Sequence, residues 1–119
     1  MDDEKLVRNI CGNILTSLGY KVDFAKDGKD AIEIYRMEAE KGKPFDLVIM
    51  DLTIPGGLGG KEAVVKLHEI DPYAKVIVSS GYSVDPIMSD YKKSGFCGVI
   101  NKPYNANQVS EVVSSILKA

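Results

Sequence analysis

The chain has 119 residues, of which 45% are hydrophobic and 27% charged, with a formal net charge of −2 and a pI near 5.4. This length fits one domain, spanning residues 1–119. The acidic balance argues against direct nucleic-acid binding through bulk electrostatics, and no apolar run approaches the ~20 residues that cross a membrane. The two cysteines lie far apart outside any CxxC pattern, which predicts reduced thiols in a cytoplasmic protein.

Helical and strand patterns alternate along the sequence. Apolar residues at helical spacing predict helices at residues 4–18, 29–39, 61–70, 86–94 and from 105 onward, with Asp85 and Asn105 as caps of the last two. Short apolar or alternating runs between them predict strands at residues 20–25, 47–50, 74–81 and 98–103. This order predicts an α/β fold, a doubly wound parallel sheet with helices on both faces.

Polar residues follow three of the predicted strands at the point where each strand ends. Asp51, Ser80 and Lys102 stand at these ends, and Asp2-Asp3 precede the first helix. Ligands of doubly wound folds bind outside the carboxyl ends of the strands. Clustered carboxylates suit Mg²⁺, a carboxylate can attack phosphorus, and a lysine can hold a phosphoryl oxygen. The set therefore predicts an acceptor site for a phosphoryl group.

The sequence resembles the receiver domains of two-component response regulators over nearly its whole length. The matching stretches are Asp2-Asp3-Glu4, Asp51 with Pro55 four positions on, Ser80-Gly81 and Lys102-Pro103. This resemblance implies a flavodoxin-like receiver fold with strand order 2-1-3-4-5. The stretches "DLTIPGGLGG", "VSSGYS" and "NKPY" are most similar to receivers at the C-terminus of hybrid histidine kinases, and this resemblance implies that the chain is a fragment of such a kinase.

The resemblance also implies roles for these residues. Asp51 would accept a phosphoryl group from a phosphohistidine on a histidine kinase or a histidine phosphotransfer domain. Asp2, Asp3 and Asp51, with the backbone carbonyl of Thr53, would hold Mg²⁺. A receiver of this kind would catalyse its own phosphorylation and dephosphorylation, and its output would pass through protein contacts.

Two further residues complete the implied switch. Ser80 would be the hydroxyl that moves onto the phosphoryl group, with Ser79 as the alternative. Lys102 would pair with the phosphoryl group, and the Lys102-Pro103 bond is expected to be cis.

The sequence departs from the family pattern at the usual aromatic switch position, which is Val99 here. The signal would then pass through loop and helix shifts, or Tyr82 or Tyr104 would serve as the movable aromatic residue.

The second departure concerns the strand that normally precedes the acidic pair at the centre of the sheet. Met1 stands immediately before Asp2-Asp3, so this first strand is missing from the sequence. Three explanations stay open: the native protein extends upstream, the sequence is a shortened form, or neighbouring strands or a partner chain close the gap.

Two other functions compete with the signalling switch. One is a phosphatase that forms an aspartyl-phosphate, but such enzymes carry a second Asp where this chain has Thr53. The other is an interaction module that is not phosphorylated, which the presence of Asp51, Ser80 and Lys102 disfavours.

Overall fold

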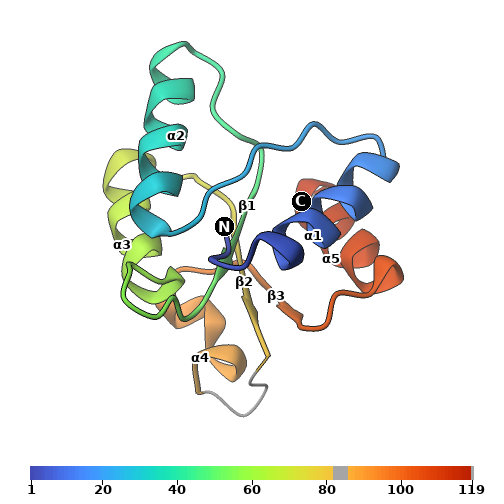
Figure 1. The fold of residues 1–119 in the computed structure, drawn as a ribbon. Coiled ribbons are helices and arrows are strands. Elements are labelled where there is room, and N and C mark those ends of the chain that lie inside the picture. Colours follow the sequence, from blue (N-terminus) through green and yellow to red (C-terminus); the bar gives the residue numbers. More distant parts are fainter. Residues whose placement is uncertain (82–85, 119) are drawn as a thin grey trace.

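The fold is built on a parallel sheet of three strands in the order β1-β2-β3 (Figure 1). The computed structural model describes residues 1–81 and 86–118, and the strands are β1 (Val48–Asp51), β2 (Val76–Ser80) and β3 (Gly98–Asn101). They coincide with three of the predicted strands. Every residue of β2 is buried, as expected for a strand with neighbours on both sides and helices on both faces. The register places Asp51 opposite Ser79 and Ser80 opposite Asn101, so the carboxyl ends of all three strands meet at one edge.

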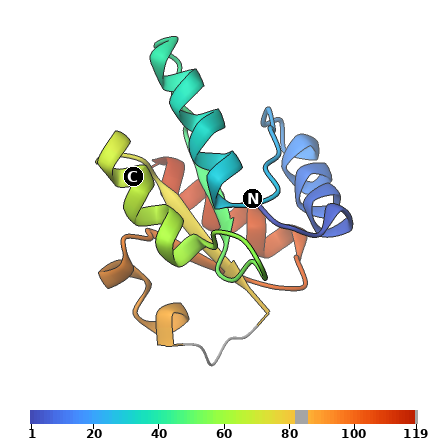
Figure 2. The ribbon, with the colours of Figure 1, turned by 60° about the vertical axis from the view of Figure 1, so that its left-hand side comes forward.

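Helices cover both faces of the sheet, which confirms the predicted α/β class (Figures 1 and 2). One face carries α1 (Lys5–Ser17) and α5 (Ala106–Lys118), and the other carries α2 (Gly28–Glu40) and α3 (Gly60–Ile70). Each face has its own apolar cluster: one surrounds Met50, Val64 and Leu67, the other Ile77, Ile100 and Val109. Within the described residues, no helix combines the length and hydrophobicity needed to cross a membrane.

Side chains close to the helix ends fix where the helices begin. The Asp27 carboxylate accepts a hydrogen bond from Asp30 N at 2.8 Å and caps α2. Asn105 Oδ1 accepts bonds from the backbone N–H groups of Asn107 and Gln108, which confirms the predicted cap of α5. These bonds satisfy amide groups that have no partner inside their helix.

The helix predicted at residues 86–94 is wrong as a single element. The structure has a short helix α4 (Pro86–Ser89) followed by a 3₁₀ helix η1 (Tyr91–Ser94). Between them, Asp90 leaves the helical conformation at φ −109° and ψ 36°, and Gly95 then turns the chain at φ 104° so that Phe96 is buried. The expected cap Asp85 and the aromatic candidate Tyr82 lie outside the described residues.

The strand predicted at residues 20–25 does not form. This stretch, here called the Tyr20–Ala25 segment, runs from the end of α1 towards α2, and Lys21–Phe24 make no backbone hydrogen bond to any residue that the structure describes. Alternating hydrophobicity makes a strand only where another backbone lies alongside at about 4.8 Å. Within the described residues, Met1 bonds to β1 and Asp2 bonds to Ala25, but no full strand joins the two segments. The sheet therefore has three strands of the 2-1-3-4-5 order instead of the four expected with the first strand missing. The predicted absence of the first strand accounts for this difference.

Candidate functional site

The predicted site residues converge at the carboxyl edge of the sheet. Asp51 is the last residue of β1 and Ser80 the last of β2, while Lys102 directly follows β3. Lys102 N donates a hydrogen bond to Ser80 O at 3.0 Å, which fixes the chain leaving β3 against the end of β2. The Lys102-Pro103 bond is cis, as predicted.

Asp2 is held at this edge although no full strand precedes it. Met1 O accepts a hydrogen bond from Asp51 N at 2.9 Å, and Asp2 N donates to Ala25 O at 3.1 Å. Arg8 reaches back from α1 and donates to Asp2 O at 2.7 Å. Asp2 is therefore buried beside Asp51, whereas Asp3 is exposed.

One lysine supplies positive charge to both buried carboxylates. Lys102 Nζ lies 2.6 Å from Asp2 Oδ2 and 3.1 Å from Asp51 Oδ2. The lysine side chain is only 18% exposed, so water screens these ion pairs less than it screens pairs on the surface. The lysine neutralises part of the charge of the acidic cluster.

Burial and charge shift the pKa values of this group. Burial raises the pKa of Asp51 above its ordinary value; Lys102 opposes the rise and the Asp2 carboxylate adds to it. Burial disfavours the charged form of Lys102, but its close ion-pair contacts with the Asp2 and Asp51 carboxylates prevail and raise its pKa. Lys102 is therefore positively charged. The raised pKa of Asp51 means that its carboxylate form is disfavoured, and a further cation nearby would stabilise that form.

The acidic residues present a donor set that suits a divalent cation. One carboxylate oxygen from each of Asp2, Asp3 and Asp51 lies within 4.8 Å of the others. Asp2 Oδ2 is buried and has no hydrogen-bond partner of good geometry within the described residues, although Lys102 Nζ lies close to it. Oxygen ligands from one or more carboxylates, completed by water, are what Mg²⁺ takes in proteins. The residues present therefore fit the predicted metal.

A hydrogen bond between Ser79 and Tyr104 was missed by sequence reasoning. Ser79 is fully buried, and its Oγ lies 2.9 Å from Tyr104 OH. Burial raises the pKa of Tyr104 well above its usual range, so the phenol stays protonated. The sequence holds a weak signal for this contact, because Ser79 and Tyr104 stand near the carboxyl ends of two predicted strands.

The remaining predicted residues lie around the same edge. Ser80 is buried at the end of β2, and Thr53 is exposed in the loop two positions after Asp51. Val99 is half-buried within β3 and packs against the cluster that contains Met50. The structure thus brings Asp2, Asp51 and Lys102 into direct contact and leaves Ser80 and Thr53 at the border of the site.

Comparison with known proteins points to one family. Residues 1–114 match the family described as response regulator receiver domain. The chemotaxis protein CheY of Treponema pallidum is 36% identical over 119 residues, and the match covers 99% of this chain and 80% of that protein. The sensor kinase CckA of Brucella abortus is 31% identical over 118 residues, with 99% of this chain but only 12% of that protein covered.

A solved structure supports the same assignment. The CheX-CheY-BeF3-Mg+2 complex from Borrelia burgdorferi contains a chain that is 28% identical, with a TM-score of 0.86. The similarity covers 97% of this chain and 84% of that chain.

Proposed function

The chain belongs to the response regulator receiver domain family of two-component signalling, and on that premise we propose that it is a phosphoryl-accepting switch with Asp51 as the acceptor. The observation that carries this proposal is the contact of Lys102 with both Asp2 and Asp51 at the edge of the sheet. A buried carboxylate at a strand end, beside a second acid and a lysine, is suited to receive a phosphoryl group and to stabilise its charge.

In the proposed reaction, a carboxylate oxygen of Asp51 attacks the phosphorus of a phosphohistidine. The O–P bond forms as the N–P bond breaks, and the electron pair stays on the imidazole nitrogen, which takes up a proton from solvent. The product is an acyl phosphate on Asp51. The donor is a histidine kinase or a histidine phosphotransfer domain, which must approach the exposed edge where Asp51 lies.

The chain's own groups hold the charges of this reaction. Asp2, Asp3 and Asp51, with the Thr53 carbonyl, would hold Mg²⁺, which neutralises negative charge on the phosphoryl group. Lys102 is placed to bind an oxygen of the phosphoryl group on Asp51, because its Nζ already lies 3.1 Å from Asp51 Oδ2.

The hydroxyl of Ser80 then connects the acceptor to the rest of the fold. Ser80 provides the hydroxyl that moves towards the new phosphoryl group at the end of β2. The signal leaves through shifts of the adjoining loops and helices, because Val99 cannot act as an aromatic switch.

Intact mass measurement tests the proposal. The purified chain is incubated with Mg²⁺ and a small phosphodonor such as acetyl phosphate. We expect a hydroxylamine-labile phosphate adduct that Asp51→Asn lacks and that the matched surface variant Asp90→Asn retains, since Asp90 is exposed. An adduct that survives in Asp51→Asn would overturn the assignment of the acceptor.

The same measurement separates the competing functions. Rapid multiple turnover of the donor with little adduct would favour an aspartyl-phosphate phosphatase. No adduct from any small donor or from a phosphorylated histidine phosphotransfer domain, with the circular dichroism spectrum intact, would favour an interaction module without phosphorylation.

A further inference from the structure

The connection between β3 and α5, residues 102–105, is held against the end of β2 at two points. We call it the lysine loop, because Lys102 is its first residue. The first point is the backbone hydrogen bond from Lys102 N to Ser80 O at 3.0 Å. The second lies two residues further on, where Tyr104 OH is 2.9 Å from Ser79 Oγ. The backbone of the loop is therefore fixed on both sides of the Lys102-Pro103 bond.

The second of these points lies on the face of the sheet that α1 and α5 cover. Side chains alternate along a strand, and Ile77 of β2 packs in the apolar cluster on that face. Ser79, two residues on, points to the same face, and the Tyr104 ring packs in the same cluster. Ser80 points to the opposite face. The bond between Tyr104 and Ser79 is therefore separate from the hydroxyl to which the switching movement is assigned.

Ser79 is a rigid anchor for the lysine loop. It is fully buried, and it is the β2 residue in register with Asp51 of β1. Its backbone oxygen accepts a hydrogen bond from Leu52 N at 2.9 Å, directly after Asp51. Through Ser79, the Tyr104 hydroxyl thus connects the loop that carries Lys102 to the strand that carries the acceptor.

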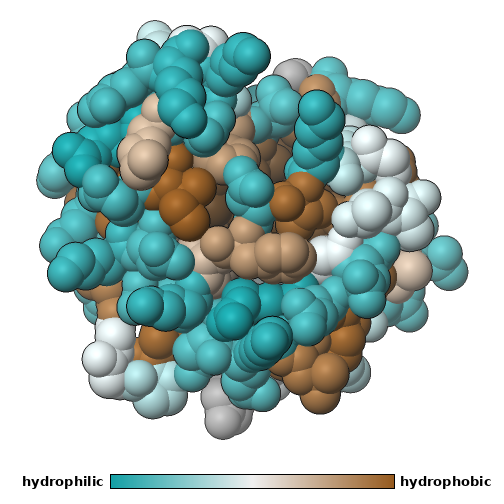
Figure 3. Space-filling view, turned by 45° about the horizontal axis from the view of Figure 1, so that its top comes forward, coloured by the Kyte–Doolittle hydropathy of each residue, from teal (hydrophilic) through white to brown (hydrophobic). Residues whose placement is uncertain are grey.

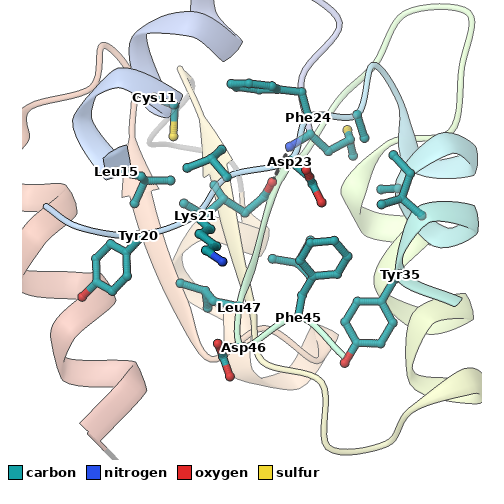
Figure 4. Close-up of a pocket in the computed structure, with 18 of the residues that line it drawn as sticks. Cys11, Leu15, Tyr20, Lys21, Asp23, Phe24, Tyr35, Phe45, Asp46 and Leu47 are labelled. Carbon is teal, nitrogen blue, oxygen red and sulfur yellow. Dashed lines mark hydrogen bonds between the residues drawn. The ribbon is translucent and has the colours of Figure 1, made fainter. Parts of the chain in front are cut away.

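The ring of Tyr104 lies among apolar groups that a phenylalanine ring would contact equally well. Cys11 and Leu15 of α1 face the strands (Figure 4), and with Tyr104 they line a cavity of about 690 Å³. Figure 3 shows a hollow bordered by hydrophobic side chains on this part of the surface. Burial raises the pKa of Tyr104, so its hydroxyl keeps the proton that a hydrogen bond needs. Tyr104→Phe therefore removes the bond to Ser79 and retains the packing of the ring.

We propose that Tyr104 is a positioning residue for Lys102: its hydrogen bond to Ser79 fixes the lysine loop so that Lys102 Nζ binds a phosphoryl group on Asp51. This inference rests on the proposed function of Asp51 and adds a residue that acts through Lys102. Tyr104 itself touches neither the carboxylates nor the phosphoryl group.

The flexibility of lysine explains why its backbone needs to be fixed. Lys102 Nζ lies 2.6 Å from Asp2 Oδ2 and 3.1 Å from Asp51 Oδ2, and it has to turn towards the phosphoryl oxygens when the group arrives. Ordering a long side chain in a new position has an entropic cost. With the loop held at both points, only the side chain is ordered in this step. Without the Tyr104 hydroxyl, part of the loop has to be ordered as well, which weakens binding of the phosphoryl group.

Beryllofluoride provides the measurement, because it binds a carboxylate oxygen in the geometry of a phosphoryl group. The chain with Mg²⁺ is titrated with beryllium in excess fluoride, and fluorine NMR measures the bound fraction. We expect Tyr104→Phe to bind beryllofluoride about fivefold more weakly than the parent chain, as expected for the loss of one neutral hydrogen bond. The control Tyr73→Phe, at a side chain that is 90% exposed, should bind as the parent chain does.

Mg²⁺ binding without beryllofluoride separates positioning of Lys102 from general damage to the site. Lys102 competes with Mg²⁺ for the carboxylates of Asp2 and Asp51, and a lysine that is held less firmly competes less. Tyr104→Phe should therefore bind Mg²⁺ at least as tightly as the parent chain, which an NMR titration of the Leu52 amide measures. Weaker binding of both Mg²⁺ and beryllofluoride would show that the whole site is disturbed and would overturn the positioning role.

Ser79→Ala removes the same hydrogen bond from its other side. It should lower the affinity for beryllofluoride by a similar factor, and the double variant with Tyr104→Phe should lose no more than either single variant. Circular dichroism checks that each variant is folded at the temperature of the titration. Losses that multiply in the double variant would mean that the two hydroxyls act separately, and this would contradict the proposal.

The titrations also distinguish failure of this inference from failure of the proposed function. A parent chain that binds no beryllofluoride in the presence of Mg²⁺ would contradict the acceptor role of Asp51, and the role of Tyr104 with it. Binding by the parent chain with the same affinity in Tyr104→Phe would overturn the role of Tyr104 alone.

Discussion

Replacing Lys102 by methionine removes the positive charge that neutralises the acidic cluster while keeping an unbranched side chain of similar length. Carboxylate oxygens of Asp2, Asp3 and Asp51 lie within 4.8 Å of one another, so each pair then repels by at least about 3.5 kcal/mol at an effective dielectric constant of about 20. Removing one member of a buried ion pair costs about 3–5 kcal/mol. Proton uptake relieves part of the repulsion, because the pKa of Asp51 is already raised. We therefore expect Lys102→Met to lower the free energy of unfolding by about 2–4 kcal/mol at pH 7.

Urea unfolding followed by circular dichroism, in a buffer with EDTA, measures this loss. The matched control is Lys41→Met, because the Lys41–Glu38 ion pair spans 3.4 Å at the surface with the lysine side chain 63% exposed. Such a pair contributes less than about 1 kcal/mol. Added Mg²⁺ should stabilise Lys102→Met more than the unaltered chain, since a metal ion then replaces the missing charge. A loss for Lys102→Met no larger than that for Lys41→Met would refute the electrostatic role given to Lys102.

Three further changes probe the fold and the acceptor. Tyr35→Phe removes the hydroxyl that donates to Asp71 Oδ2 at 2.6 Å and should cost about 1.5 kcal/mol in urea unfolding; an unchanged midpoint would contradict this. The pKa of Asp51 is raised above its ordinary value of 3.8 in the folded chain. The free energy of unfolding therefore falls as the pH rises from 3.8 through the pKa of the folded state, because the folded chain disfavours the carboxylate form. Asp51→Asn should therefore be more stable than the parent chain at pH 7 in EDTA, with the difference gone at about pH 3, and a less stable variant at pH 7 would contradict the sign. A Cβ at Gly60 would lie 2.8 Å from Asp51 O, so Gly60→Ala should lower stability by about 1–3 kcal/mol. Gly81→Ala should be neutral in the same assay, because its Cβ meets no atom of the described residues within 4 Å.

The sequence was sufficient to predict that Asp51 and Lys102 lie at one edge of the sheet, because one rule governs where strand ends meet. Parallel strands end at the same edge, so Asp51 and Lys102, each at a strand end, had to approach one another once the strands were correctly predicted. Asp2 follows no predicted strand, so the strand rule by itself does not place it at this edge. The position of Asp2 in the structure depends on the hydrogen bonds of Met1 and Arg8, which no sequence pattern predicts.

The failures of sequence reasoning have a common physical cause. Hydrophobic alternation in the Tyr20–Ala25 segment is a local property, but a strand needs a partner backbone, and that partner is missing. The contact between Ser79 and Tyr104 likewise depends on where two distant segments meet, and the position of Ser80 directly before Gly81 had favoured that neighbouring serine. The break at Asp90 was missed because a 3₁₀ helix and an α-helix share nearly the same local pattern.

The packing of α1 against α5 has a consequence for the order in which the molecule folds. The strands β1, β2 and β3 follow one another in the sequence and pair in the same order, so their contacts close short loops. Helix α1 packs against α5, which lies at the opposite end of the sequence, so this contact closes the longest loop and has the highest entropic cost. The packing of α1 is also incomplete, because its Leu6 is 71% exposed. Helix α1 should therefore dock last and detach first. Because Arg8 of α1 holds Asp2 in place, the acidic cluster would be completed only in the final step of folding.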